Sequence, residues 1–101
     1  MGSTITVQVK YYAAIREVAE KTDESLELIS GSVAYDLLCK VAGLYGDKMQ
    51  AEIFDDKNAN GLRDDMMVTL NEAILNHAKS KETILNPGDV LALFPIFPGG
   101  G

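Results

Sequence analysis

The chain has 101 residues and a net charge of −6. Such an acidic chain is a poor nucleic-acid binder, because binding to phosphate needs clustered Lys and Arg, and it favours a basic partner. The chain has a single cysteine, Cys39, which excludes an intramolecular disulfide. Together with the single histidine, His77, it supplies too few ligands for a zinc site of His and Cys. No apolar run approaches the roughly 20 residues that span a bilayer. We therefore predict one cytoplasmic domain, residues 1–101, that binds or carries rather than catalyses.

The first part of the chain predicts two strands around a short helix. Residues 4–11 alternate apolar and polar side chains, with the period of a strand that buries one face. Residues 13–20 are rich in helix-forming residue types and predict one or two helical turns. Residues 24–29 alternate again, and the short connection predicts that the two strands form an antiparallel pair.

The main helix is predicted to follow Gly31, with Ser32 as its N-cap. Six apolar residues at helical spacing form one stripe along it: Val33, Leu37, Leu38, Val41, Leu44 and Tyr45. Gly46 stands where a glycine commonly ends a helix. Cys39 lies outside the stripe, so we expect an exposed, reduced thiol.

Short strands are predicted in the second half of the chain, at residues 51–54, 66–70, 73–75 and 89–94. The stretches 55–61 and 77–83 are polar and predict loops. Asn86, Pro87 and Gly88 predict a turn, because proline fixes φ and glycine accepts a positive φ.

The order of these elements predicts an α+β fold with the β-grasp, or ubiquitin-like, arrangement. A mixed sheet of four to five strands packs on one main helix, which buries the apolar side of both. Residues 95–101 follow the last strand and predict an exposed, flexible tail that ends in three glycines. Glycines lack a Cβ, so this tail can enter a channel too narrow for side chains and present its terminal carboxylate. An inert end or a cloning remnant is the alternative.

Three motifs occur in a fixed order ahead of the terminal glycines. Residues 9–17 (VKYYAAIRE) join a strand to an Arg-Glu helical turn, and residues 67–72 (MVTLNE) form a strand that ends in an Asn turn. Residues 86–95 (NPGDVLALFP) hold a Gly-Asp turn, an apolar strand and a Phe-Pro step. Together with the terminal glycines, this set resembles the MoaD/ThiS family of ubiquitin-like sulfur carriers over residues 5–101.

The resemblance implies a non-catalytic sulfur carrier for molybdopterin (molybdenum or tungsten cofactor) biosynthesis that binds no cofactor itself. A partner adenylyltransferase of the ubiquitin-activating type would use ATP and Mg to adenylate Gly101. A sulfur donor protein would then convert the adenylate to a thiocarboxylate. The acceptor would be a pterin precursor in the large subunit of molybdopterin synthase. Gly100 would thread behind Gly101, or carry the reactive carboxylate if the third glycine is trimmed, since the family typically ends in two.

Other functions share this fold and tail, and the fold does not choose among them. A protein modifier would use the same activated tail to acylate lysines of target proteins. Related carriers would deliver sulfur for thiamin, cysteine or tRNA thiolation. A passive interaction domain with an inert glycine tail is the third reading.

The last strand predicts a docking surface beside the tail. If Leu91 and Leu93 point into the core, Ala92 and Phe94 point outward, because side chains alternate along a strand. An exposed phenylalanine at the base of a reactive tail suits a docking anchor. The remaining expected partner-binding residues are Pro95, Phe97 and Gly99. The alternative is that Phe94 lies in the core and Leu93 does not.

Three further signals are interpreted as ordinary surface features. Residues 56–61 (DKNANG) fit the first half of an EF-hand calcium loop, but Met67 stands at the twelfth position, where a Glu is required. Residues 1–6 fit an N-myristoylation pattern, but their last residue falls in the first predicted strand. His77 lies in a polar stretch without a second ligand, so we expect a solvated imidazole.

Overall fold

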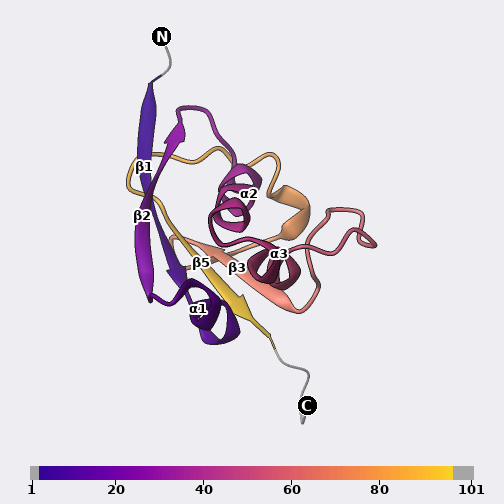
Figure 1. The fold of residues 1–101 in the computed structure, drawn as a ribbon. Coiled ribbons are helices and arrows are strands. Elements are labelled where there is room, and N and C mark those ends of the chain that lie inside the picture. Colours follow the sequence, from indigo (N-terminus) through magenta and orange to yellow (C-terminus); the bar gives the residue numbers. More distant parts are fainter. Residues whose placement is uncertain (1–2, 97–101) are drawn as a thin grey trace.

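The computed structural model describes residues 3–96, which form a five-stranded sheet and its covering helices (Figure 1). The elements in chain order are β1 (Thr4–Tyr11), α1 (Ala13–Ala19), β2 (Asp23–Ile29), α2 (Ala34–Tyr45), α3 (Asp47–Ile53), β3 (Met66–Leu70), β4 (Ala73–Leu75), the 3₁₀ turn η1 (His77–Lys79) and β5 (Val90–Pro95). The strand order is β2-β1-β5-β3-β4. β5 is parallel to β1, and all other pairs are antiparallel. The predicted mixed-sheet α+β fold is confirmed.

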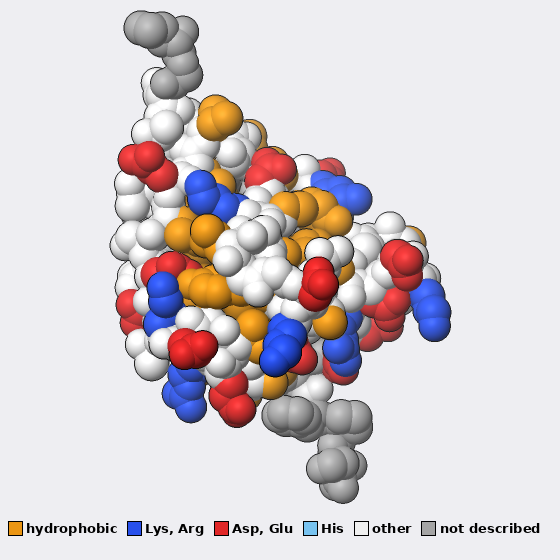
Figure 2. Space-filling view, viewed as in Figure 1, with side chains coloured by type: hydrophobic (Ala, Val, Ile, Leu, Met, Phe, Trp, Pro, Cys, Tyr) orange, Lys and Arg blue, Asp and Glu red, His pale blue; other side chains and the backbone are white. Residues whose placement is uncertain are grey.

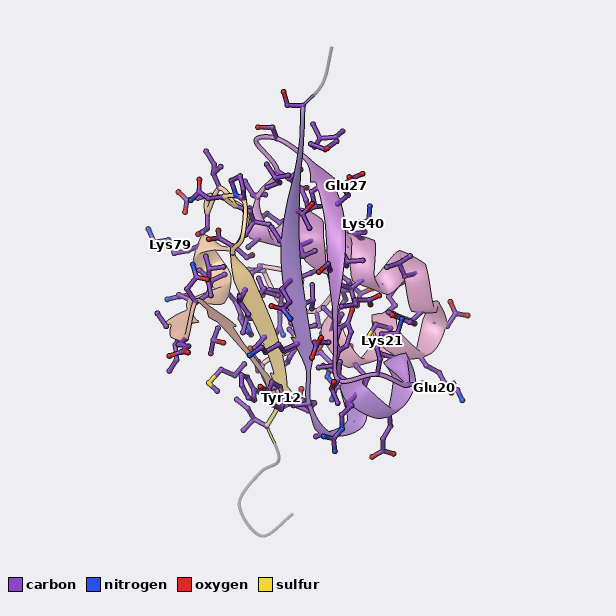
Figure 3. The ribbon with its side chains drawn as sticks, turned by 90° about the vertical axis from the view of Figure 1, so that its left-hand side faces the viewer. Tyr12, Glu20, Lys21, Glu27, Lys40 and Lys79 are labelled. Carbon is purple, nitrogen blue, oxygen red and sulfur yellow. The ribbon has the colours of Figure 1, made fainter. Side chains whose placement is uncertain are left out.

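The helices cover one face of the sheet and leave the other face open (Figures 1 and 3). Alternate residues of the central strands and the apolar stripe of α2 meet in the covered layer. Fully buried members of this core include Val9, Leu37, Leu38, Val41, Leu91 and Leu93. Burying one such side chain contributes roughly 1.5–3 kcal/mol, so this shared layer is a main source of the stability of the fold.

The ends of α2 differ in how well they match the sequence prediction. Ser32 is not the N-cap: its N–H donates to Ile29 O at 3.0 Å, which closes a turn before the helix. Val33 takes the cap position, and its N–H donates to the Asp36 carboxylate at 2.9 Å. Leu44 is 51 % exposed, so the buried stripe is narrower than predicted. Gly46 caps the C-terminus with a φ of +82°, as predicted.

The predicted strand at residues 51–54 is wrong, because this segment belongs to helix α3. Its sequence DKMQAEI consists mostly of helix-forming residue types, and Met49 and Ile53, four positions apart, are both fully buried. Only Phe54 makes a strand-like bridge, with Leu62. The predicted loop at 77–83 also contains one turn of 3₁₀ helix, η1, which Asn76 caps by accepting from the Ala78 N–H.

The charged side chain of Glu24 lies at the edge of the core, where β1, β2 and α2 meet. The hydroxyls of Tyr11 and Tyr45 both donate to Oε2 of Glu24, and Lys21 pairs with Oε1 at 3.3 Å. The two tyrosine rings meet edge to face, with centroids 6.0 Å apart. Burial opposes ionisation of Glu24, but the donated hydrogen bonds and Lys21 outweigh it, so the pKa of Glu24 lies below its usual value. The carboxylate is therefore satisfied as an anion.

Candidate functional site: the open sheet face at the end of β5

β5 presents alternate side chains to the two faces of the sheet. Leu91 and Leu93 are fully buried beneath the helices, while Phe94 lies half-buried on the open face, which confirms the predicted orientation of this strand. The expectation that Ala92 would be accessible is wrong, because Ala92 is only 6 % exposed. Its short side chain lies between the partner residues of the flanking strands, Lys10 and Thr69, and their larger side chains cover it.

Phe94 does not stand alone, because its ring stacks on Tyr12. The ring centroids are 4.3 Å apart and the planes differ by 11°. The parallel pairing of β1 with β5 produces this contact, since Tyr11 lies opposite Leu93 and Tyr12 follows it. Tyr12 remains 37 % exposed, at the lower end of the sheet in Figure 3. Sequence reasoning missed Tyr12, whose signal was its place directly after the inward-facing Tyr11.

The stacked rings close one end of a groove on the open face. The groove has a volume of about 460 Å³ and is lined by Lys10, Tyr12, Thr69, Asn71, Glu72, Val90, Ala92 and Phe94. Asn71 fixes its other end: its side chain donates to Asp89 at 3.0 Å and accepts from the Val90 N–H at 2.9 Å. Asn71 and Glu72 both have positive φ, as in the hairpin turns that favour Asn. The groove is therefore held at both ends.

The exit of the chain from β5 is fixed by hydrogen bonds. Pro95 ends β5 opposite Met66, and the Ile96 N–H donates to Asp65 O at 2.6 Å. Arg63 holds the Asp65 carboxylate with two bonds of 2.8 and 2.6 Å, which lower the pKa of Asp65. Residues 95 and 96 of the expected tail are thus attached to the sheet.

The remaining predicted site residues fall on the terminal segment. Phe97, Gly99, Gly100 and Gly101 lie outside the described residues. The expected tail chemistry and its partner contacts therefore stay predictions. The described part of the chain ends just before that segment, at Ile96, which is hydrogen-bonded to Asp65 and follows the Tyr12–Phe94 stack.

The other polar candidates have local structural roles or none. In residues 55–62, Asp55 accepts from the Lys57 N–H and Asn60 from the Leu62 N–H, as in Asx turns. No group of three or more His, Cys, Asp or Glu within residues 3–96 is arranged to hold a metal ion. Cys39 is exposed, as predicted. The pKa of its thiol is raised, mainly because neighbouring atoms partly shield it from water and secondly because of the nearby charge of Asp36.

Two observations concern the surface as a whole. Asp, Glu, Lys and Arg side chains are interspersed over the side shown in Figure 2, so the net negative charge is not gathered there. Within the described range, no helix is long and apolar enough to cross a membrane.

The sheet order and the helices on one face define a ubiquitin-like β-grasp fold. The chain belongs to the ThiS family, whose sequence profile matches residues 9–100. This match confirms the family resemblance of the three sequence motifs.

Several solved structures share this fold. The small archaeal modifier protein 1 from Methanosarcina acetivorans is 24 % identical, with a TM-score of 0.79 over 98 % of this chain and 100 % of that one. A putative molybdopterin converting factor, subunit 1, from Pyrococcus furiosus is 26 % identical, with a TM-score of 0.71 over 92 % and 99 %. A chain of the Amycolatopsis orientalis BexX/CysO complex is 19 % identical, with a TM-score of 0.70 over 93 % and 99 %. A search of the curated proteins found no match.

Proposed function

We propose that this chain carries sulfur for molybdopterin biosynthesis as a thiocarboxylate on its C-terminal glycine, Gly101. One observation carries the proposal: the central strand β5 ends at Pro95, beside the stacked Tyr12 and Phe94, and the sequence then leads to three glycines. The likeness to a putative molybdopterin converting factor subunit from Pyrococcus furiosus supports the choice of pathway.

The chemistry begins at a carboxylate that is ionised at neutral pH and is therefore a poor electrophile. A partner adenylyltransferase joins the Gly101 carboxylate to the α-phosphate of MgATP and releases pyrophosphate. Hydrosulfide delivered by a sulfur donor protein then attacks the acyl carbon. A C–S bond forms, the C–O bond to AMP breaks, AMP leaves, and the proton of hydrosulfide passes to solvent. The oxidation state of sulfur does not change, so no oxidant or reductant is required.

This chain contributes the reacting atoms and the docking surface rather than a catalytic side chain. Tyr12 and Phe94 offer a flat aromatic contact next to the chain exit, and aromatic anchors of this kind dominate many interfaces. The bonds from Ile96 to Asp65, and from Asp65 to Arg63, fix where the terminal segment starts. A docked partner thus receives the terminal segment from a fixed starting point, Ile96. The sulfur is then the nucleophile toward a pterin precursor in the large subunit of molybdopterin synthase.

Intact-mass analysis tests the proposal. The chain is incubated with its activating enzyme, MgATP and sulfide, and we expect a mass increase equal to the difference between one sulfur and one oxygen atom. The thiocarboxylate form should then convert a pterin precursor to molybdopterin with the large subunit. The matched control lacks ATP and should keep its mass. An unchanged mass in the complete mixture would contradict the proposal.

Protein modification is the second candidate function. The likeness to small archaeal modifier protein 1 favours it, and it uses the same adenylate with a lysine amine in place of hydrosulfide. Conjugates of higher mass that form in cell extract, and that require the terminal glycine, would support this function. A thiocarboxylate that delivers sulfur for thiamin, cysteine or tRNA thiolation, but not to the pterin precursor, would support the sulfur-carrier function and assign it to a different pathway.

A further inference from the structure

β2 is one edge of the sheet, separated from β5 by β1, and its outer side faces no other strand within residues 3–96. The register identifies which main-chain groups face outward. The Tyr11 N–H donates to Thr22 O and the Ser30 N–H to Ser3 O, so every second residue of β2 between them bonds to β1. The alternate residues, Asp23, Ser25, Glu27 and Ile29, point their N–H and C=O groups away from the sheet.

Part of this edge is already satisfied. Lys40 of α2, which lies beside Glu27 in Figure 3, donates to Glu27 O at 2.7 Å. The Ser32 N–H donates to Ile29 O at 3.0 Å. No hydrogen bond within the described residues reaches the outward C=O of Asp23 or the outward N–H and C=O of Ser25. A free stretch of strand edge therefore runs from Asp23 to the N–H of Glu27, and Lys40 marks its end.

The side chains along the free edge have a definite chemistry. Asp23 and Glu27 are exposed on the open face, and neither forms a salt bridge within residues 3–96. Beyond them, Ile29 is 68 % exposed and lines a shallow groove of about 340 Å³ together with Leu28 and Lys40. The edge thus offers unpaired main-chain groups, two carboxylates without a salt bridge, of which Asp23 lies opposite Lys10 of β1, and one apolar contact.

A second copy of this chain is a poor occupant of the edge. Antiparallel pairing of two β2 strands centred on Ser25 would set Asp23 of each copy directly opposite Glu27 of the other. Like charges in directly opposed positions destabilise a strand pair, whereas opposite charges stabilise it. The same carboxylates therefore favour a strand that carries Lys or Arg at alternate positions, on the face where Asp23 and Glu27 lie.

We propose that the β2 edge is a docking site for an extended peptide segment of a partner protein, with basic side chains at alternate positions, which adds to the sheet beside Asp23–Glu27. Main-chain hydrogen bonds to Ser25 hold the segment, and its basic side chains pair with Asp23 and Glu27. The site lies on the opposite side of β1 from β5. It is therefore separate from the Tyr12–Phe94 surface, and it does not depend on the chemistry of Gly101.

Titration of the full-length, ¹⁵N-labelled chain with the peptide acetyl-Lys-Val-Lys-Val-Lys-Val-amide tests the proposal. We expect amide shifts at Asp23, Ser25, Glu27 and Ile29, and slower hydrogen exchange at Ser25 and Glu27. The acidic analogue acetyl-Glu-Val-Glu-Val-Glu-Val-amide should bind about tenfold more weakly or worse, because its charges oppose the two carboxylates. Equal binding of both peptides, or no shift at these amides at millimolar peptide, would overturn the proposal.

Two variants and one matched control locate the binding. Ser25→Pro removes an outward N–H and no hydrogen bond to β1, so the sheet should stay intact while peptide affinity falls about tenfold or more. Ser25→Ala keeps the N–H and should bind like the parent chain. Glu27→Lys tests the charge without any backbone change and should also weaken binding by about tenfold. Unchanged affinity in Glu27→Lys, shifts confined to Phe94 and its neighbours, or a dimer in sedimentation that excludes the peptide would each refute the assignment.

Discussion

Tyr11 and Tyr12 are adjacent in the chain but belong to two different regions of the molecule. Tyr11 points to the covered face, is 1 % exposed and donates its hydroxyl to Glu24. Tyr12 points to the open face, is 37 % exposed and stacks on Phe94 beside the chain exit. The alternation of a strand thus separates a stabilising tyrosine from one that we assign to docking. Stability and function should therefore respond independently to changes one residue apart.

Deletion of Gly100 and Gly101 should show the largest difference between the effect on function and the effect on stability. This deletion should abolish adenylation and sulfur transfer, because the reacting carboxylate is displaced, yet the Tm should stay nearly unchanged because terminal glycines bury little surface. Mass spectrometry after incubation with the activating enzyme, together with calorimetry, measures both. Full activity of the shortened chain would contradict the assignment of the reactive end.

Phe94→Ala should mainly affect the open-face region. We expect the KM of the chain as substrate for its activating enzyme to rise about tenfold, as for the loss of an aromatic anchor. The stack with Tyr12 is also lost, at a cost of about 0.5–1.5 kcal/mol in the free energy of unfolding. Steady-state kinetics and urea unfolding give the two values. Tyr12→Ala should show the same pattern, and an unchanged KM in both variants would remove the docking role.

Tyr11→Phe should affect only the covered region. It deletes one of the two hydroxyl donors to the Glu24 carboxylate, and hydrogen bonds to charged groups contribute about 1.5–3 kcal/mol. Urea unfolding should show a loss in this range, while the KM for activation stays that of the parent chain. Tyr45→Phe is the matched control, because it removes the second donor to the same oxygen. A raised KM in either variant would break the separation between the faces.

The smallest effect is expected from pH. The hydrogen bonds from Tyr11 and Tyr45 and the charge of Lys21 make the pKa of Glu24 lower in the folded chain than in the unfolded one. Its contribution to stability is therefore complete above the unfolded-state pKa and is lost as the pH falls through the folded-state pKa. Glu24→Gln should flatten this part of the acid side of the stability curve, measured by urea unfolding between neutral and acidic pH. A parallel curve for the variant would show that Glu24 does not contribute.

Most strands could be predicted from the sequence because each buries one face and alternates accordingly. β3 and β4 have the predicted bounds, and β5 is shifted by one residue at each end. Helix α3 was missed because its seven residues hold only two buried apolar positions, Met49 and Ile53, too few to show a period. Local helix propensity was the better guide there.

The site could be predicted only in part. Alternation placed Phe94 outward, but its contact with Tyr12 depends on the parallel pairing of β1 with β5, which no local pattern encodes. Ala92 shows the converse limit. Its orientation followed from alternation, whereas its accessibility depends on the size of the side chains on both neighbouring strands.

The central position of β5 has a consequence for how the chain is made. The sheet joins its first strand to its last one, Thr4–Tyr11 to Val90–Pro95, so the β1–β2 pair cannot become a complete sheet until translation has passed Pro95. Contacts so distant in sequence also form slowly. A polypeptide interrupted before β5 lacks the central strand and is open to proteolysis. Only a chain that extends through Pro95 can therefore complete the sheet and form the groove beside Phe94.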